Sequence, residues 1–524
     1  MYLTKTQQAA MTDPSLFSAK PQTSTVWWKV ACLFTALGLI WRIGRYLFDF
    51  PIWGDEIMVA LNFPDKSYTE LLGHLDHCQV APPLWLWAEK FLYETAGPSG
   101  LSLRFTPLIA GCLALVLHAW FAWTLMPGRA AAMAIALLAV AIWPVSMSTL
   151  TKPYSTDLLV ALAMLLPAHA ALTHTRPVWA MALLAIISPV ALLASFPAMF
   201  IAGSTLLVLL PAAWKGAPST RWAYLALVGT TAFGAWASIQ IGQNQLASPT
   251  GTAEIDTQQG MVDYWSHGFP PADPLRWIPW FLGALTGQIM AYPVGAANGG
   301  STLTVLMAIL GVVTWMRSGS KAVLALLLLP LVLNFMAALV HRYPFGASCR
   351  LAQFLAPSVC LLAGLGLDAC LSRTSRWPAV LVSLVLLALG GGGLARDWIW
   401  PYRDPVFVWM RGTMDDAVQA AGNDSVVVNH RRDSMECVFA WRWLHAPAKV
   451  GWNGALPQGE RSYDRVWVFT QEGCPMPPGP TALEFLKSQD PRWRETRFLN
   501  FQYPPPNPQK QPPIHVEMVL LERD

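Results

Sequence analysis

The sequence predicts an all-α, polytopic membrane domain with about 11 transmembrane helices, followed by a small C-terminal α/β domain. Hydrophobic residues make up 54% of the chain and charged residues 13%, a balance outside the range of soluble proteins. Long apolar stretches recur up to residue 396, after which they shorten while Pro and charged residues increase. We therefore expect a cytoplasmic tail at 1–25, a transmembrane domain at 26–396 and an outer α/β domain at 397–524.

Apolar segments of about 20 residues, the length that crosses a bilayer, locate the individual spans. They are predicted at 26–48, 105–126, 130–150, 157–173, 178–195, 198–214, 222–242, 300–316, 321–340, 352–371 and 378–396. Residues 276–292 add a re-entrant or twelfth segment. Residues 1–25 lack the apolar core of a cleavable signal peptide, so the first span is expected to be retained.

Basic residues in the short connections predict the orientation. One side of the predicted membrane domain receives Arg129, His174, Arg176, Lys215, Arg221, Arg317, Lys321, Arg373 and Arg376. The positive-inside rule places that side in the cytoplasm. The outer side then receives 49–104, 151–156, 243–299, 341–351 and everything after 396. The net charge of +4, without a long Lys/Arg block, argues against a nucleic-acid partner, and the 26 Trp residues suit contact with membrane lipids.

The acidic pair Asp55-Glu56 follows the first span directly. Pro51 and Gly54 indicate the start of a helix, where the helix dipole favours acidic side chains. Charge beside low-dielectric walls is costly, which favours a chemical role. Capping and catalysis therefore both account for the pair. In a helix the two side chains point about 100° apart, so we expect Asp55 to react and Glu56 to support it.

Loop 49–104 has the apolar spacing of short interfacial helices. Within it, His74 and His77 are spaced to share one helix face, which suits either substrate-lining side chains or metal ligands. Asp49, Asp55 and His77 are the candidate ligands for a divalent cation.

Cationic side chains gather at the predicted outer surface. Lys152 and Tyr154 follow the third span, where membrane-surface anchoring and substrate binding are both open interpretations. Arg42 and Arg45 share a face near the outer end of the first span and either reach the lipid headgroups or point at the same anionic site.

A second cationic turn carries Arg342, Tyr343 and Arg350. Guanidinium groups bind phosphate bidentately, so this turn suits recognition of an anionic headgroup, with Tyr343 lining the substrate site. Anchoring to lipid phosphates accounts for it equally well.

Five motifs occur in an order that resembles the GT-C superfamily of integral-membrane glycosyltransferases, especially bacterial relatives of protein O-mannosyltransferases and of the lipid A aminoarabinose transferase. They are Trp53-Gly-Asp-Glu56, Ala81-Pro-Pro-Leu-Trp-Leu-Trp87, Leu103-Arg-Phe-Thr-Pro107, Lys152-Pro-Tyr-Ser-Thr156, and Arg342-Tyr-Pro with Arg350 and Ala356-Pro357. The resemblance covers roughly residues 26–370. Several relatives carry a basic residue before the Pro-Pro pair, where this chain has Ala81.

The resemblance implies transfer of a sugar from a polyprenyl-phosphate donor to an acceptor hydroxyl on the outer face, with inversion at the anomeric carbon. The acceptor is a lipid, protein or polysaccharide. Asp55 and Glu56 would form the catalytic pair, and Lys152, Tyr154, Arg342, Arg350, Arg42 and Arg45 would bind the donor phosphate. The location implied is a bacterial inner membrane, with the site facing the periplasm or exterior. Some relatives need a divalent cation such as Mg²⁺ or Mn²⁺ and others need none.

A transporter or flippase of an anionic lipid-linked substrate is the alternative function. Two features count against it: the polar clusters lie at one face rather than the midplane, and no matched broken helices recur in two halves.

In the tail, strands are predicted at 425–428, 466–469 and 516–521, and helices at 436–444 and 481–487. Cys437 and Cys474 could pair in an oxidising compartment. This tail would either bind the acceptor or cover the site.

Overall fold

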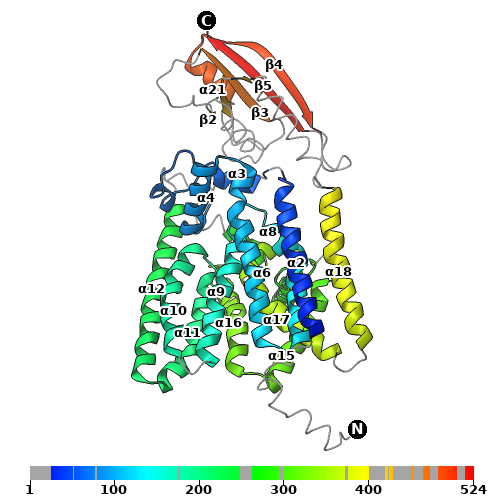
Figure 1. The fold of residues 1–524 in the computed structure, drawn as a ribbon. Helices are drawn as coiled ribbons and strands as arrows, with labels where there is room; N and C mark the ends of the chain where they lie inside the picture. Colours follow the sequence, from blue (N-terminus) through cyan, green and yellow to red (C-terminus); the bar gives the residue numbers. More distant parts are fainter. Residues whose placement is uncertain are drawn as a thin grey trace, which may run out of the picture.

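The chain is an integral multi-pass membrane protein with a small mixed sheet near its C-terminus (Figure 1). The computed structural model describes residues 25–247 apart from 51, 53, 77–78 and 174–176, residues 262–400 apart from 296–299 and 372–375, and residues 419, 421–422, 424–428, 450–452, 464–471, 482–503 and 514–523. Within these ranges, ten helices are long and apolar enough to cross a membrane. The predicted helix at 436–444, Cys437 and Cys474 lie outside the described residues.

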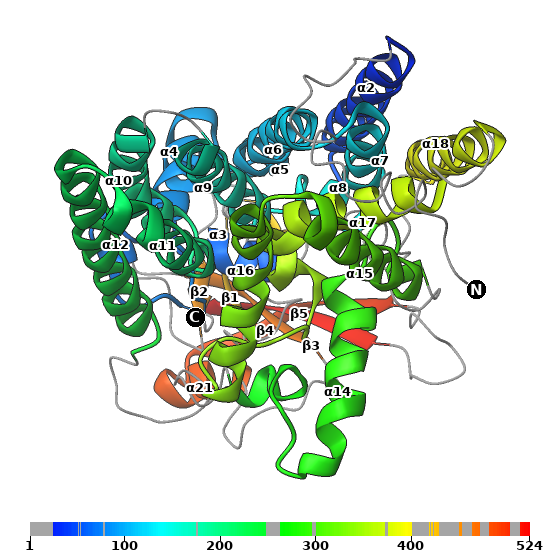
Figure 2. The ribbon, with the colours of Figure 1, turned by 90° about the horizontal axis from the view of Figure 1, so that it is seen from below.

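The membrane helices follow the predicted order. They are α2 (Thr25–Leu47), α5 and α6 (Gly100–Leu103 and Phe105–Leu125), α7 (Gly128–Ala139), α8 (Ile142–Met147), α9 (Tyr154–Thr173), α10 (Pro177–Ala194), α11 (Ala198–Lys215), α12 (Pro218–Gln245), α15 (Gly300–Ser318), α16 (Lys321–Leu339), α17 (Ala356–Leu371) and α18 (Arg376–Ile399). Seen from below, α10 and α12 lie at one edge of the bundle, and α2 and α18 lie at another (Figure 2).

The span expected at 130–150 is two short helices, α7 and α8, rather than one continuous helix. Proline removes one helical hydrogen bond, and its ring clashes with the carbonyl four residues earlier. Pro144 therefore disfavours a continuous helix here, and the chain leaves helical geometry at Val140 and Ala141, although α9, α10, α11 and α16 each continue through a proline. Ile142 N, freed by the break, donates to Pro293 O at 3.0 Å.

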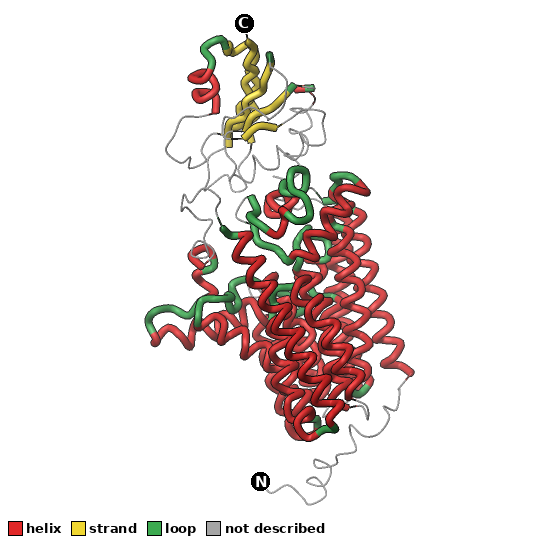
Figure 3. The backbone as a smooth tube through the Cα atoms, turned by 90° about the vertical axis from the view of Figure 1, so that its left-hand side faces the viewer, coloured by secondary structure: helices red, strands yellow, loops and turns green. Residues whose placement is uncertain are grey.

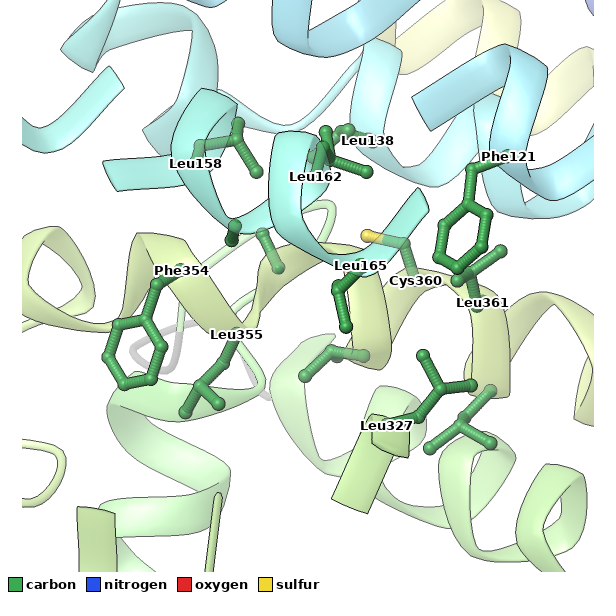
Figure 4. Packing of buried hydrophobic residues seen from close by; sticks show 14 of the residues in the cluster. Phe121, Leu138, Leu158, Leu162, Leu165, Leu327, Phe354, Leu355, Cys360 and Leu361 are labelled. Atoms are coloured by element: carbon green, nitrogen blue, oxygen red, sulfur yellow. The ribbon is translucent and has the colours of Figure 1, made fainter. Parts of the chain in front are cut away.

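Small residues allow the central helices to approach closely. α7 is rich in alanine, and its residues from Ala130 to Ala139 are all buried. A Cβ on Gly364 of α17 would lie 2.6 Å from Ala134 N, and a Cβ on Gly311 of α15 would lie 1.9 Å from Leu362 O. Leu and Phe side chains from α6, α9, α16 and α17 fill the surrounding core (Figure 4).

One end of the bundle carries the short helices of the first long loop (Figure 1). These are α3 (Gly54–Ala60), the 3₁₀ helix η2 (Glu70–Leu72) and α4 (Pro83–Ala96), and they match the interfacial helices expected in 49–104. We call this end of the bundle the α3 end. Gln245, at the end of α12, fixes the loop: its side-chain Oε1 accepts from Ala81 N at 3.0 Å, and its Nε2 donates to Leu71 O at 3.1 Å.

Residues 262–290 form an arm that includes α14 (Trp277–Ala284) and projects from the bundle (Figure 2). The arm continues into a π-helical turn, η5 (Leu285–Ile289). α14 and η5 together are too short to span a bilayer, so the arm is not the twelfth span that the sequence left open. It packs against the turn before the 3₁₀ helix η7 (Cys349–Leu355).

The C-terminal sheet lies beyond the α3 end (Figures 1 and 3). Its strand order is β2-β1-β3-β5-β4, in which β1 is parallel to β2 and β3, and β5 is antiparallel to β3 and β4. The bounds are β1 (Ser425–Val428), β2 (Val450–Trp452), β3 (Arg465–Gln471), α21 (Ala482–Gln489), β4 (Trp493–Tyr503) and β5 (Ile514–Arg523). The predicted strands at 425–428, 466–469 and 516–521 are confirmed, whereas β4 was missed because charged residues interrupt its apolar pattern.

Candidate active site

Helix α3 presents the acidic pair in its first turn and separates the two side chains. The Glu56 side chain is 1% exposed, whereas the Asp55 side chain is 35% exposed. The α3 helix therefore buries one carboxylate and leaves the other accessible, as expected for neighbouring positions on a helix.

Glu56 joins three segments of the chain. Its carboxylate accepts from Arg104 Nε at 2.9 Å and from Arg104 Nη2 at 2.7 Å, a bidentate pair. The same carboxylate accepts from Thr151 N at 2.8 Å. Arg104 also donates to Phe50 O. The start of α6 and the turn before α9 are thus held against α3, which supports a positioning role for Glu56.

Asp55 contacts a cation from a distant turn. Arg350 Nη1 lies 2.9 Å from Asp55 Oδ2, and both side chains retain solvent exposure. The Arg350 guanidinium lies 5.1 Å from the ring centre of Trp265 and 5.9 Å from that of Tyr154, both within the range of cation–π attraction. The predicted residues Asp55, Arg350 and Tyr154 therefore meet at the α3 end.

Lys152 is buried beside this group and donates from Nζ to Gln79 Oε1 at 2.7 Å. The pKa of Lys152 is lowered to about 8, chiefly by burial; the Asp55 carboxylate opposes this shift, the Arg350 guanidinium adds to it, and the Glu56 carboxylate opposes it. Lys152 therefore interacts electrostatically with Asp55, Glu56 and Arg350.

We call Asp55, Glu56, Arg104, Lys152 and Arg350 the charged cluster. It has one more positive than negative side chain when all five are ionised. A partly buried excess of positive charge attracts an anion, because the low dielectric strengthens the interaction. The cluster therefore combines an accessible carboxylate with cations suited to a phosphate group.

Two predicted phosphate ligands have other partners. Arg42 is fully buried in α2, and its Nη1 donates to Gly38 O at 3.0 Å and to Ala139 O at 3.4 Å, near the end of α7. Arg45 donates from Nη1 to Asp397 Oδ2 of α18 at 3.1 Å and from Nε to Thr149 Oγ1 at 2.9 Å. These contacts give both arginines roles in helix packing.

In the second cationic turn, the neighbouring side chains of Arg342 and Tyr343 differ in their surroundings. Arg342 is exposed, eight residues before Arg350. Tyr343 packs its ring against Phe200 and Phe354, and its hydroxyl donates to Leu351 O at 3.1 Å. Burial holds the pKa of Tyr343 well above its usual value, so its phenol stays neutral.

The candidate metal ligands are only partly described. His74 Nε2 lies 3.9 Å from Asp76 Oδ1, and Asp49 follows α2 with a positive φ of 45°. His77 lies outside the described residues. Within the described ranges, no group of three or more His, Cys, Asp or Glu side chains is arranged to hold a metal ion.

Several residues of the site were not predicted. Gln79, Trp265 and Arg104 contact Lys152, Arg350 and Glu56, respectively. Arg104 lies in one of the motifs that carry the family resemblance, so the sequence contained a signal for it. Gln79 and Trp265 lie in loops without a recognisable pattern.

Comparisons with known proteins found similar solved structures. ArnT from Cupriavidus metallidurans in the apo state is 16% identical with a TM-score of 0.44, covering 80% of this chain and 76% of that chain. ArnT bound to undecaprenyl phosphate is 14% identical with a TM-score of 0.46, at the same coverages. The Archaeoglobus fulgidus oligosaccharyltransferase complex with Zn and sulfate is 13% identical with a TM-score of 0.42, covering 80% of this chain and 62% of that chain.

No protein-family model matches the chain, and no curated protein matches its sequence. At these TM-scores and identities the structural similarities do not assign a site, which depends on the geometry described above.

Proposed function

We propose that the protein is an integral-membrane glycosyltransferase of the GT-C type, which transfers a sugar from a polyprenyl-phosphate donor to an acceptor hydroxyl. The observation that carries the proposal is the accessible Asp55 carboxylate in contact with Arg350 and close to Lys152. The order of the five sequence motifs supports it. The α3 end faces the periplasm or exterior, as the basic connections at the other end indicate.

The proposed reaction proceeds by displacement at the anomeric carbon. The acceptor hydroxyl oxygen attacks this carbon from the face opposite the phosphate, so the configuration inverts. The bond between the anomeric carbon and the phosphate oxygen breaks, and its electron pair remains on the polyprenyl phosphate. Asp55 accepts the proton of the hydroxyl group. The proton then passes from Asp55 to the departing phosphate or to water, which restores the Asp55 carboxylate.

The cations stabilise the leaving phosphate. Lys152 and Arg350 supply positive charge where negative charge develops, in a partly buried site where such stabilisation is strong. Arg350 must then divide its donors between Asp55 and the phosphate, which its five N–H groups permit. Glu56 and Arg104 hold α3 in place and take no part in bond making.

The test measures polyprenyl phosphate released from a panel of polyprenyl-phosphate sugars by purified protein in nanodiscs, with Mg²⁺ or Mn²⁺ added or chelated. Asp55→Asn should reduce turnover by about 10²–10⁴-fold, because the proton acceptor is lost. Asp273→Asn, at the exposed start of a 3₁₀ helix in the arm, is the matched control and should retain activity. Movement of labelled lipid in liposomes without sugar release would instead support a transporter.

A further inference from the structure

The turn that carries Arg350 is held by the arm as well as by hydrogen bonds among its own residues. Phe345 lies parallel to Phe281 of α14, with ring centres 5.6 Å apart, and its backbone N donates to Gly268 O at 2.7 Å. Gly346 has a φ of +66°, and a Cβ there would lie 2.7 Å from Ala284 Cβ. The arm and the turn therefore fit together as one unit.

Gln288 of the arm contacts the residue immediately before Arg350. Its side-chain Oε1 accepts a hydrogen bond from Cys349 N at 3.0 Å and another from Cys349 Sγ at 3.1 Å. Gln288 lies in the π-helical turn η5, and such turns are frequent at functional sites. Cys349 is buried and immediately precedes Arg350 in the chain.

The start of η7 needs this acceptor. The first N–H groups of a helix have no partner within it, and a side-chain cap normally supplies one. Ser348 stands at the N-cap of η7, but its side chain makes no capping hydrogen bond. Instead, Gln288 Oε1, from the π-helical turn η5, accepts the hydrogen bond of the first N–H group of η7, that of Cys349. On the other side of Cys349, its carbonyl oxygen accepts from Gln353 Nε2 at 2.8 Å.

We propose that Gln288 is a positioning residue, which holds Cys349 so that the Arg350 guanidinium reaches both Asp55 and the donor phosphate. This inference rests on the proposed function and assigns a further residue to the same site. A displacement of about 1 Å at a site that orients a reacting group is enough to lower the rate strongly. The described hydrogen bonds of the Gln288 side chain go to Cys349 and not to Asp55, Glu56 or Lys152.

The test compares Gln288→Leu with Gln288→Glu, which keeps an oxygen acceptor. Gln288→Leu should raise the KM for the donor about tenfold, the size expected when one or two hydrogen bonds that orient a ligand contact are lost. It should weaken inhibition by polyprenyl phosphate by the same factor. Gln288→Glu should restore most of the affinity. Thr286→Val, on the same π-helical turn with a hydroxyl bonded within the arm, should leave both constants unchanged.

A double-mutant cycle separates positioning from mere support of the fold. If Gln288 acts through Arg350, adding Gln288→Leu to Arg350→Ala should change the donor KM by less than about twofold. Additive effects in the cycle, or a wild-type KM in Gln288→Leu, would overturn the inference while leaving the proposed function intact. A wild-type protein that releases no polyprenyl phosphate from any donor would instead overturn the proposed function.

Discussion

Replacing Glu56 with alanine should destabilise the protein more than any change at an exposed ion pair. The substitution leaves the Arg104 guanidinium, whose side chain is 4% exposed, without its bidentate carboxylate partner. It also removes the acceptor of Thr151 N. Breaking a buried ion pair by removing one partner costs about 3–5 kcal/mol, because the remaining charge stays buried. We therefore expect the free energy of unfolding to fall by about 3–5 kcal/mol.

The matched control is Asp368→Ala at the opposite end of the bundle. Asp368 pairs with Arg129, whose side chain is 25% exposed, so water can solvate the remaining charge. Because the Arg129 and Asp368 side chains keep 25% and 17% of their exposure, the loss should be smaller than at Glu56, about 1 kcal/mol. Both variants remove one carboxylate from an ion pair between distant segments, and they differ chiefly in burial.

The assay is unfolding of the purified protein in mixed micelles by increasing SDS, followed by loss of helical circular dichroism. Glu56→Gln, which keeps the volume but not the charge, should lose most of the same stability. The double variant Glu56→Ala with Arg104→Ala should be more stable than Glu56→Ala alone, because no buried charge is left unpaired. Equal stability of Glu56→Ala and Asp368→Ala would refute the reasoning.

Four further outcomes are expected. Lys152 loses its proton as pH rises through its pKa of about 8, so donor KM should increase above that pH, whereas Lys152→Arg should show no such increase. Over the same window, stability should rise with pH, because the folded protein releases the proton at a lower pH than the unfolded chain; unfolding midpoints at pH 7 and 9.5 check this. Gly346→Ala forces a Cβ against Ala284 at positive φ and should lower both activity and thermal stability, while Gly283→Ala, in open space, should lower neither substantially. Asp397→Asn should weaken the contact between α2 and α18, seen as faster proteolysis of α18, and unchanged cleavage would contradict that role.

Local patterns in the sequence were sufficient to predict the spans. Runs of apolar residues marked the ten long helices, because a bilayer demands a fixed length of apolar helix. The break at Val140 was missed because the 130–150 segment is apolar throughout, and Pro144 was treated as part of a span. Periodicity likewise missed β4, in which Arg494, Glu495 and Arg497 interrupt the apolar residues.

The partners within the site could not be predicted from local patterns. Asp55 and Arg350 are 295 residues apart in the chain, and Lys152 and Gln79 are 73 residues apart. Motif order indicated that the residues belong to one site, but it could not distinguish Arg350, which contacts Asp55, from the exposed Arg342. Arg42 and Arg45 were assigned to phosphate binding because their spacing gives a shared face, although that face packs against α7 and α18.

The hydrogen bonds of α2 also bear on how the chain is synthesised. Its two arginines find acceptors at Ala139 and Asp397, which are 97 and 352 residues further along the chain. At a translation rate of about 5–20 residues per second, Asp397 emerges roughly 20–70 s after Arg45. During that interval the first helix enters the bilayer with a guanidinium that must be solvated by water or lipid headgroups. Helix α2 therefore reaches its final position only after α18 has been made.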